Sequence, residues 1–307
     1  MTRYKIILNP TAGKGNGLKV RPQIEEILTK YKLDYDIDLT GYPEHAIELA
    51  RKAAEDGFDV VVAAGGDGTA NEVLNGLMQF KQSHKKCPLM AALPVGRGND
   101  FAFGAGIPIG VQESCDLLAS GLKKKIDIGK VTGGLHPQGL YFGNGVGIGF
   151  DAVVGFVAAK SRLTGMLSYL VAAVKTIFIY YKPPMVDVIL ENKTFQISAL
   201  LVSIMNGRRM GGGFMMAPDA KPNDGIFDLC LVRSVPQSAM FGLIGMVMKG
   251  TQSTHPAVST AQSKKVIVRA IQGTVPAHAD GVTVCEAGQE LTIEILADEL
   301  EIITRLV

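Results

Sequence analysis

The sequence predicts an α/β domain over residues 1–130 followed by a mainly antiparallel β-sandwich domain over residues 131–296. Strand and helix patterns alternate through the first part of the chain, which indicates a mostly parallel sheet with helices on its faces. From about Val131 the pattern changes to short strands separated by tight turns, which is typical of antiparallel sheets. We expect a last strand, near residues 297–307, to complete the first domain.

The first domain can be followed element by element. Strands are predicted at residues 4–10, 35–40, 59–64 and 88–94, and a helix at residues 44–57 that Gly57 ends. Two more helices are indicated by apolar residues at one-face spacing, namely Val20, Ile24, Ile27, Leu28 and Tyr31, and then Val73, Leu74, Leu77 and Met78. Polar, glycine-bearing segments follow the strands, so a ligand is expected beyond their carboxyl ends.

The second domain reads as strands with two helices between them. Residues 185–204 predict a hairpin that turns at Glu191–Lys193, and further strands are expected at residues 225–232, 264–271, 291–296 and 300–304. The helices are predicted at residues 162–182 and 236–250. No flexible linker separates the two domains, so we expect them to share an interface with a ligand cleft.

The segment of residues 162–182 is the one that is long and apolar enough to suggest a membrane helix. Its apolar residues form one stripe that avoids Thr164, Ser168 and Lys175, which favours a helix packed on a sheet and leaves a membrane-surface role open. The stripe consists of Leu163, Met166, Leu167, Leu170, Val171, Val174, Ile177, Phe178 and Tyr181.

Composition excludes several classes of protein. The 307 residues are 47% hydrophobic and 20% charged, as in soluble globular proteins, and the formal charge of +2 argues against nucleic-acid binding. The four cysteines lack CxxC spacing, which argues against zinc and disulfides and favours a reducing cytoplasm. The first residues lead into a strand, so no secretory signal is expected.

The segment "GGDGTAN", Gly65 to Asn71, joins a buried strand to a helix. Its glycines let the backbone approach a ligand closely, and the start of a helix offers unpaired N–H groups to a phosphate. Asp67 would repel a bare phosphate, so it is expected to meet a cation. The segment therefore predicts a nucleotide bound together with its metal ion.

Two other turns follow the same logic. "NPTAGKGNG", Asn9 to Gly17, lies between the first strand and the first helix, and it is not a P-loop, because the required glycine and Ser or Thr are missing. "LPVGRGND", Leu93 to Asp100, follows another strand and offers Arg97 to a phosphate. Each turn alone is compatible with a plain connection between a strand and a helix.

Together with "PVGRGNDFA", "KIDIGKV", "YFGNGVGIGFDA" and "APDAKPNDGIFDLCLV", these turns resemble the bacterial diacylglycerol kinase and related lipid kinase family. This family shares its catalytic domain with sphingosine and ceramide kinases, and the resemblance runs over nearly the whole chain. It implies a Rossmann-like first domain of the NAD kinase and diacylglycerol kinase type. It also implies ATP and Mg²⁺ as cofactors, a lipid substrate at the membrane surface, and a cytoplasmic protein that can contact the inner face of the membrane; a homodimer is compatible with it.

The resemblance also implies roles for individual residues. Asp67 would hold the catalytic Mg²⁺, with Asp127 as its partner in a network of carboxylates and water, and Asp224 would hold a structural Mg²⁺ with the carbonyls of Lys221 and Ile226. From the residues alone, Asp127 would be a cap and "PNDGI" a turn before a strand. The residues implied to contact ATP are Asn9, Pro10, Thr11, Ala12, Gly13, Thr40, Gly65, Gly66, Asp67, Gly68, Thr69, Ala70, Asn71 and Arg97.

The sequence departs from the family at two positions. Arg97 stands where a small hydroxyl residue is usual, so it is expected either to act as a cation at the γ-phosphate or to obstruct the pocket. Val282 stands where a glutamate usually takes the proton of the lipid hydroxyl. Asp280 or His278 is the candidate replacement, and a lone histidine in such a turn is more often structural.

Three hypotheses follow. The first is an ATP-dependent lipid kinase whose apolar second domain shelters acyl chains, with Arg162, Lys175 and Lys182 facing an anionic membrane. The second is a nucleotide- or lipid-binding homologue with weakened catalysis, motivated by Val282 and Arg97. The third is a soluble NAD-type or sugar kinase, which shares "GGDG".

Overall fold

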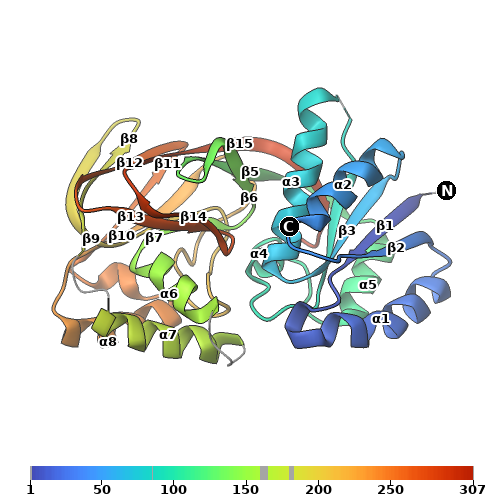
Figure 1. Cartoon of the computed structure of the whole chain (residues 1–307), viewed down its shortest axis with the longest axis horizontal. Coiled ribbons are helices and arrows are strands. Elements are labelled where there is room, and N and C mark those ends of the chain that lie inside the picture. Colours follow the sequence, from blue (N-terminus) through green and yellow to red (C-terminus); the bar gives the residue numbers. More distant parts are fainter. Residues whose placement is uncertain (1, 85, 160–164, 180–182, 307) are drawn as a thin grey trace. The chain divides into compact units, whose positions relative to one another are not determined.

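The computed structural model describes residues 2–84, 86–159, 165–179 and 183–306. The chain divides into two compact units, the first formed by Met1–Asp127 and Asp298–Val307 and the second by Ile128–Ala297. Strands β5 (Lys123–Gly133) and β15 (Glu290–Ile303) each contain residues of both units. The predicted class, an α/β domain followed by a mainly antiparallel β domain, is confirmed (Figure 1).

The first unit is a parallel sheet in the order β15-β4-β3-β1-β2, in which Ile302 of β15 pairs with Met90 of β4. Strand β3 is buried at every position because helices cover both faces of the sheet, with α2 and α3 on one and α1 and α5 on the other (Figure 1). The elements of the first unit, in chain order, are β1 (Arg3–Leu8), α1 (Ala12–Lys30), β2 (Asp34–Leu39), α2 (His45–Glu55), β3 (Val60–Gly65), α3 (Asp67–Ser83), β4 (Leu89–Pro94), α4 (Asp100–Gly104) and α5 (Val111–Ser120).

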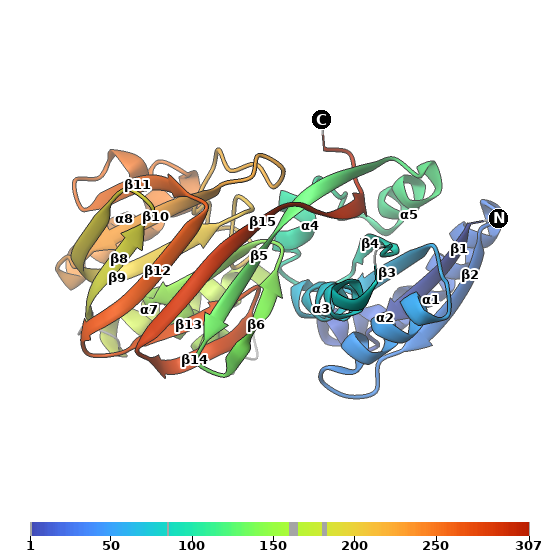
Figure 2. The same ribbon diagram turned by 90° about the horizontal axis from the view of Figure 1, so that it is seen from above.

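The second unit contains two sheet layers and a layer of helices, which Figure 1 shows from the side and Figure 2 from above. The strands are β6 (His136–Phe142), β7 (Gly145–Gly149), β8 (Met185–Leu190), β9 (Thr194–Met205), β10 (Phe227–Arg233), β11 (Val258–Ser263), β12 (Lys265–Gln272), β13 (Val275–Ala279) and β14 (Val282–Gly288). The helices are α6 (Phe150–Ala159), α7 (Gly165–Ile179), α8 (Gln237–Lys249) and a 3₁₀ turn (Gln252–Thr254).

Strand β9 joins the two layers of strands. Its first part pairs with β8, whereas Leu201–Met205 pairs with β7 and β10. One apolar core fills the space between the layers, and a second lies between the β7-β9-β10 layer and the helices. The second core contains a cavity, so the helical layer helps to form the apolar site of this unit.

Three expectations about elements were wrong. The two strands expected near the end of the chain are one strand, β15, in which Asp298 takes a positive φ of 53°. Helix α6 was not among the helices predicted for this part of the chain. Helix α7 does not bury the predicted stripe: Ser168 is 2% exposed, whereas Phe178 is 69% exposed. Arg162, Leu163, Thr164, Tyr181 and Lys182 of that prediction lie outside the described residues.

Among the residues that the structure describes, no helix has the length and apolarity needed to cross a membrane.

Candidate active site

Three glycine-bearing loops meet at the carboxyl ends of β1, β3 and β4. A Cβ atom at Gly13 would lie 2.7 Å from the carbonyl oxygen of Val95, and one at Gly96 would lie 2.2 Å from the Cα of Gly66. Side chains cannot be accommodated at such distances, so only glycine lets the loops touch. The structure thus brings together the three turns that the sequence singled out separately.

Asn9 ties the first of these loops to helix α3. Its Oδ1 accepts hydrogen bonds from the backbone N–H (3.0 Å) and the hydroxyl (2.9 Å) of Thr11, and its Nδ2 donates to Thr69 Oγ1 (3.1 Å). Residues Gly13, Lys14 and Gly15 all have positive φ, at 59°, 60° and 87°, so regular helix begins only after them. The segment that contains Pro10, Thr11 and Ala12 is therefore an open turn at the edge of the sheet.

Asp67 and Asp100 converge beside Gly98. Asp67 is the first residue of α3 and is half-buried, and its Oδ1 accepts the backbone N–H of Phe101 at 3.0 Å. A Cβ atom on Gly98 would lie 2.7 Å from Asp67 Oδ2 and 3.5 Å from Asp100 Oδ2. Asp100 is 7% exposed and was not selected from the sequence, although its place after two glycines and Asn99 was a usable signal.

These two carboxylates fit a magnesium ion. Mg²⁺ is typically held by one or two carboxylates, with water and substrate phosphate completing its octahedral shell. Among the described residues no group of three or more His, Cys, Asp and Glu is arranged to hold a metal ion. A cation at Asp67 and Asp100 would therefore need ligands from water and from phosphate.

The predicted phosphate segment forms the end of β3 and the first turn of α3. Gly66 precedes the helix in an extended conformation, and its carbonyl accepts the N–H of Ala70 at 3.0 Å. Thr69 and Asn71 are buried, whereas Gly68 is exposed and has no atom within 4 Å of the place that a Cβ would occupy. The backbone at Gly68 is thus accessible to a ligand, and the helix dipole there favours an anion.

Thr40 and Arg97 lie on the loops next to this segment. Thr40 follows β2, and its N–H donates to the carbonyl of Leu8 at 3.0 Å, which places it beside the end of β1. Arg97 is exposed between Gly96 and Gly98. Thr40 and Arg97, both predicted to contact ATP, therefore lie on loops at the carboxyl end of the sheet.

Glu72 of α3 holds the first turn of α2. Its Oε1 accepts the N–H of Glu44 and its Oε2 accepts the N–H of Ala46, both at 3.1 Å. Burial raises the pKa of Glu72, and the two backbone hydrogen bonds partly oppose that rise. The side chain thereby fixes the Thr40 loop to the phosphate segment, a role that the sequence did not reveal.

Asp127 is 1% exposed within β5, and its Oδ1 accepts the N–H of Asp298 at 2.8 Å. That hydrogen bond connects β5 to Asp298 of β15, which has a positive φ. The partnership of Asp127 with Asp67 stays a prediction.

Asp280 binds the backbone of the glycine-rich turn before β7. Its Oδ2 accepts the N–H of Gly143 (2.7 Å), and its Oδ1 accepts those of Asn144 (3.1 Å) and Gly145 (2.9 Å). Both oxygens of this buried carboxylate are thus engaged with the backbone, a geometry that favours a structural role over proton transfer. Val282 is half-buried and packs against the core between the two sheet layers.

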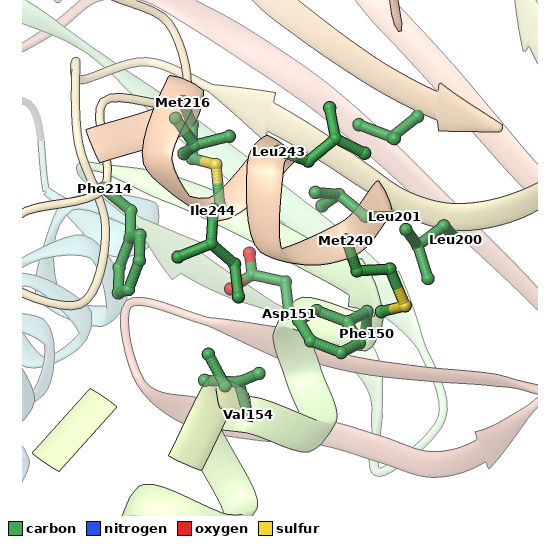
Figure 3. Close-up of a pocket in the computed structure, with 13 residues that line it drawn as sticks. Phe150, Asp151, Val154, Leu200, Leu201, Phe214, Met216, Met240, Leu243 and Ile244 are labelled. Atoms are coloured by element: carbon green, nitrogen blue, oxygen red, sulfur yellow. The ribbon is translucent and has the colours of Figure 1, made fainter. Parts of the chain in front are cut away.

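Asp151 lies in the wall of the cavity between the β7-β9-β10 layer and the helices. The cavity has a volume of about 60 Å³ and is lined by apolar side chains of β9, α6, α7 and α8, with Asp151 among them (Figure 3). Asp151 Oδ2 is buried without a hydrogen-bond partner among the described residues, and it lies 3.8 Å from Nε2 of His278. A buried carboxylate oxygen without a donor is costly, which points to a ligand that supplies one.

The predicted structural metal residues lie in the turn before β10. Asp224 is exposed, and its Oδ1 accepts the N–H of Ile226 at 3.3 Å, while Lys221 is exposed nearby in sequence. Burial raises the pKa of Asp228, and the charges of Asp224 and Asp219 raise it further. The binding of a structural Mg²⁺ by Asp224 with the carbonyls of Lys221 and Ile226 stays a prediction.

Two family models match the two parts of the chain. Residues 3–131 match the family model of the diacylglycerol kinase catalytic domain, and residues 144–304 match that of the YegS C-terminal NAD kinase beta sandwich-like domain. A diacylglycerol kinase of Bacillus subtilis (strain 168) is 30% identical over 271 residues, which is 87% of this chain and 86% of that protein. A diacylglycerol kinase of Staphylococcus epidermidis is 31% identical over 277 residues, which is 86% of this chain and 81% of that protein.

The fold is shared with a solved structure. A crystal structure of a diacylglycerol kinase from Bacillus anthracis str. Sterne aligns with a TM-score of 0.73 at 22% identity, covering 99% of this chain and 97% of that chain. At this identity the likeness concerns the fold.

Proposed function

The chain belongs to the diacylglycerol kinase family and is a kinase, and from that premise we propose that it transfers the γ-phosphate of ATP to a hydroxyl of a lipid such as diacylglycerol. The observation that supports this most is the pair Asp67 and Asp100 at the start of α3, among three loops whose glycines expose backbone. Soluble NAD-type kinases share the glycine-rich turn "GGDG". The apolar cavity of the second unit favours a lipid acceptor.

The first unit binds the nucleotide. The backbone from Gly65 to Asn71 surrounds the phosphates, with the N-terminal dipole of α3 directed at them. Asp67 and Asp100 would hold Mg²⁺, which would supply positive charge to neutralise the phosphates. Arg97, being exposed on a short loop, reaches the γ-phosphate as a cation.

The second unit binds the acceptor. An acyl chain enters between β9 and the helices, and the lipid hydroxyl donates a hydrogen bond to Asp151 Oδ2. As the bond between the lipid oxygen and phosphorus forms, the bond from phosphorus to ADP breaks and the hydroxyl proton passes to Asp151. The nearby His278 stabilises the ionised carboxylate.

The acyl chain requires the cavity to open. Its present volume of about 60 Å³ is well below the ~150 Å³ of an engineered cavity that admits benzene. Met216 and Met240 line it, and unbranched methionine side chains rearrange easily. The cavity is therefore the starting point of a tunnel that the lipid widens.

A transfer assay tests the proposal. Pure protein is incubated with labelled ATP, Mg²⁺ and mixed lipid micelles, and the variant Asp67→Ala provides the background. Labelled lipid of the expected product mass supports a lipid kinase, and no labelled lipid above the Asp67→Ala background rejects it. Activity on a water-soluble acceptor that is indifferent to lipid and detergent would instead favour a soluble NAD-type kinase.

Val282 favours a second candidate, a homologue with weakened catalysis. Valine accepts no proton, and the loss of a general base costs about 10²–10⁴ in rate. The variant Val282→Glu tests this, because it restores the carboxylate usual in the family. If the wild type already turns over and Val282→Glu is no faster, the weakened-enzyme hypothesis fails.

A further inference from the structure

A row of small and polar residues crosses the sheet layer that faces the helices of the second unit. His278 of β13 pairs with Gly147 of β7, and Gly147 pairs on its other side with Ser203 of β9. Ser203 pairs in turn with Cys230 of β10. The residues before and after each of these four belong to the core between the two sheet layers, so the four themselves face the helices. We call His278, Gly147, Ser203 and Cys230 the polar row.

Asp151 of α6 lies over the glycine of the polar row. A Cβ atom at Gly147 would lie 2.2 Å from Asp151 Oδ2 and 2.6 Å from His278 Nε2, so only glycine leaves room for the carboxylate. Paired positions of antiparallel strands place their Cβ atoms ~4.5–5.5 Å apart, so Asp151 Oδ2 lies within roughly 8 Å of the Cβ of Ser203. A ligand with two neighbouring polar groups can therefore contact Asp151 and Ser203 together.

Three polar atoms at this place are buried without a hydrogen-bond partner among the residues that the structure describes. They are Oδ2 of Asp151, Nδ1 of His278 and Oγ of Ser203, and Ser203 is 0% exposed. Cys230 adds a thiol that stays protonated, because burial, and after it the charge of Asp151, raise its pKa to about 12. Unpaired buried polar atoms are rare in native proteins, so three together indicate a site for a polar ligand.

The polar row adjoins the apolar cavity. Leu201 and Val232, which pair with each other, line the cavity. They lie two positions along their strands from the pair of Ser203 and Cys230, hence on the same face of the layer. Asp151 belongs to both places, because it also lines the cavity (Figure 3). The site thus has an apolar end and a polar end.

An acylated glycerol matches this division of the site. Its free hydroxyl donates a hydrogen bond, as Oδ2 of Asp151 requires, and the ester carbonyl on the neighbouring carbon accepts one, which the hydroxyl of Ser203 can donate. Its acyl chain is apolar, as the lining of the cavity is. An ether-linked lipid has no carbonyl oxygen at that place, so it would leave the hydroxyl of Ser203 without a partner.

We propose that Ser203 determines the specificity of the acceptor site, by donating a hydrogen bond to the ester carbonyl oxygen next to the hydroxyl group that is phosphorylated. The protein would then prefer acylated glycerols to their ether analogues. The inference rests on the proposed function and deepens it, since it specifies the class of lipid that the second unit accepts.

Titration calorimetry with the full chain and without ATP tests the proposal. The two probes are 1,2-dihexanoylglycerol, a diester, and 1,2-dihexylglycerol, the corresponding diether. We expect the wild type to bind the diester about tenfold more tightly, because the diether leaves a buried hydroxyl unpaired. Ser203→Ala should bind the two lipids equally, because it lacks the hydroxyl that distinguishes them.

Ser263→Ala is the matched control. Ser263 is 3% exposed at the end of β11 and lies outside the polar row, and its Oγ donates to the carbonyl of Lys265 at 2.6 Å. This variant should keep the tenfold preference for the diester. The melting temperature of Ser203→Ala should equal or exceed that of the wild type, because the hydroxyl that it removes has no partner among the described residues.

Three results would overturn the proposal. Equal affinities of the wild type for the two lipids would show that the site does not contact the ester. An undiminished preference in Ser203→Ala, together with a lowered melting temperature, would assign the hydroxyl to a buried water molecule. Failure to bind either lipid would remove the acceptor from the polar row.

The transfer of labelled phosphate from ATP to the same two lipids is measured separately. Transfer at equal kcat/KM to both lipids would reject the role of Ser203 and leave the lipid kinase in place. A preference for the diester in binding, with no transfer to either lipid, would support the role of Ser203 in binding and reject the kinase. The two failures are therefore distinguishable.

Discussion

Among the described residues that line the cavity, Asp151 alone is charged. A carboxylate in an apolar wall needs a compensating partner, and the imidazole of His278 lies 3.8 Å from it, beyond hydrogen-bonding distance. Gly147 makes this arrangement possible, because a Cβ there would lie 2.2 Å from Asp151 Oδ2. At the scale of single residues, the site therefore has a vacant acceptor that a hydroxyl can satisfy.

The variant Asp151→Asn tests that assignment. We expect kcat for lipid phosphorylation to fall about 10²–10⁴-fold, because an amide accepts no proton, while the KM for ATP stays unchanged. Steady-state kinetics at varied ATP and lipid measure both constants. Asp187→Asn serves as the control, because Asp187 is a half-buried residue of β8 whose carboxylate accepts a hydrogen bond from Gln196. A full-rate Asp151→Asn enzyme would contradict the proposed role.

At the scale of elements, α3 shows the difference between a glycine that packing requires and one that a ligand requires. Gly96 touches the backbone of Gly66, whereas Gly68 has open space around it although it lies inside α3. Glycine inside a helix is unfavourable relative to alanine. We infer that Gly68 is retained for the approach of the nucleotide.

Gly68→Ala is therefore expected to raise stability and to weaken ATP binding. The free energy of unfolding should increase by about 0.5–1 kcal/mol, and ATP affinity should fall about tenfold because a methyl group holds phosphate away from the backbone N–H. Thermal unfolding and titration calorimetry measure the two effects. Gly242→Ala, at an open site on α8, should stabilise without changing ATP affinity. Unchanged ATP binding in Gly68→Ala would refute the contact.

The contact between α2 and α3 predicts a pH dependence through Glu72. Burial raises its pKa above 4.5, so the folded protein holds this proton more tightly than the unfolded chain does. Its contribution to stability is then fully present below the unfolded-state pKa and is lost as pH rises through the folded-state pKa.

The variant Glu72→Gln has no carboxyl group to titrate. The free energy of unfolding of the wild type minus that of the variant should decrease as pH rises from about 4 to about 6. Urea denaturation across this range measures the difference. Glu48→Gln, an exposed change on α2, should show no such trend. A difference that stays constant or increases with pH would contradict the effect of burial.

At the scale of the whole molecule, the proposed phosphoryl transfer would combine a nucleotide bound by the first unit with an acceptor bound by the second unit. Strands β5 and β15 each contribute residues to both units, so the chain connects them twice. In the proposed function, the first unit would bind the phosphate donor and the second unit would select the acceptor. Substitutions in the second unit alone should therefore alter the selectivity for the acceptor.

Ala173→Leu tests this separation. The larger side chain narrows the cavity, so kcat/KM should fall more for long-chain than for short-chain diacylglycerols, and overpacking should cost about 1–3 kcal/mol of stability. The KM for ATP should not change. Rates with a series of acyl-chain lengths measure the effect, with Ala239→Leu on α8 as the control at a partly exposed position. An equal loss at every chain length would argue against an acyl tunnel.

The sequence by itself determined the fold class, most of the strands and the phosphate segment. Periodicity of two or of 3.6 residues reports which positions are buried, and glycines before a helix mark a close backbone approach. The predicted hairpin at residues 185–204 is the pair β8 and β9 for the same reason. The quoted motifs, in their order, were enough to suggest the family.

Only the tertiary structure decided which side chains meet. Asp67 and Asp100 are separated by 33 positions, and Asp151 and His278 by 127, so no local pattern relates the members of either pair. The outward side of α7 was likewise decided by its neighbours, because Ser168 and Thr176 satisfy their hydroxyls locally and are buried together with Ile177, whereas Phe178 is exposed. The hydrophobic pattern of a helix predicts that it has an apolar face, but packing against other elements decides which face is buried.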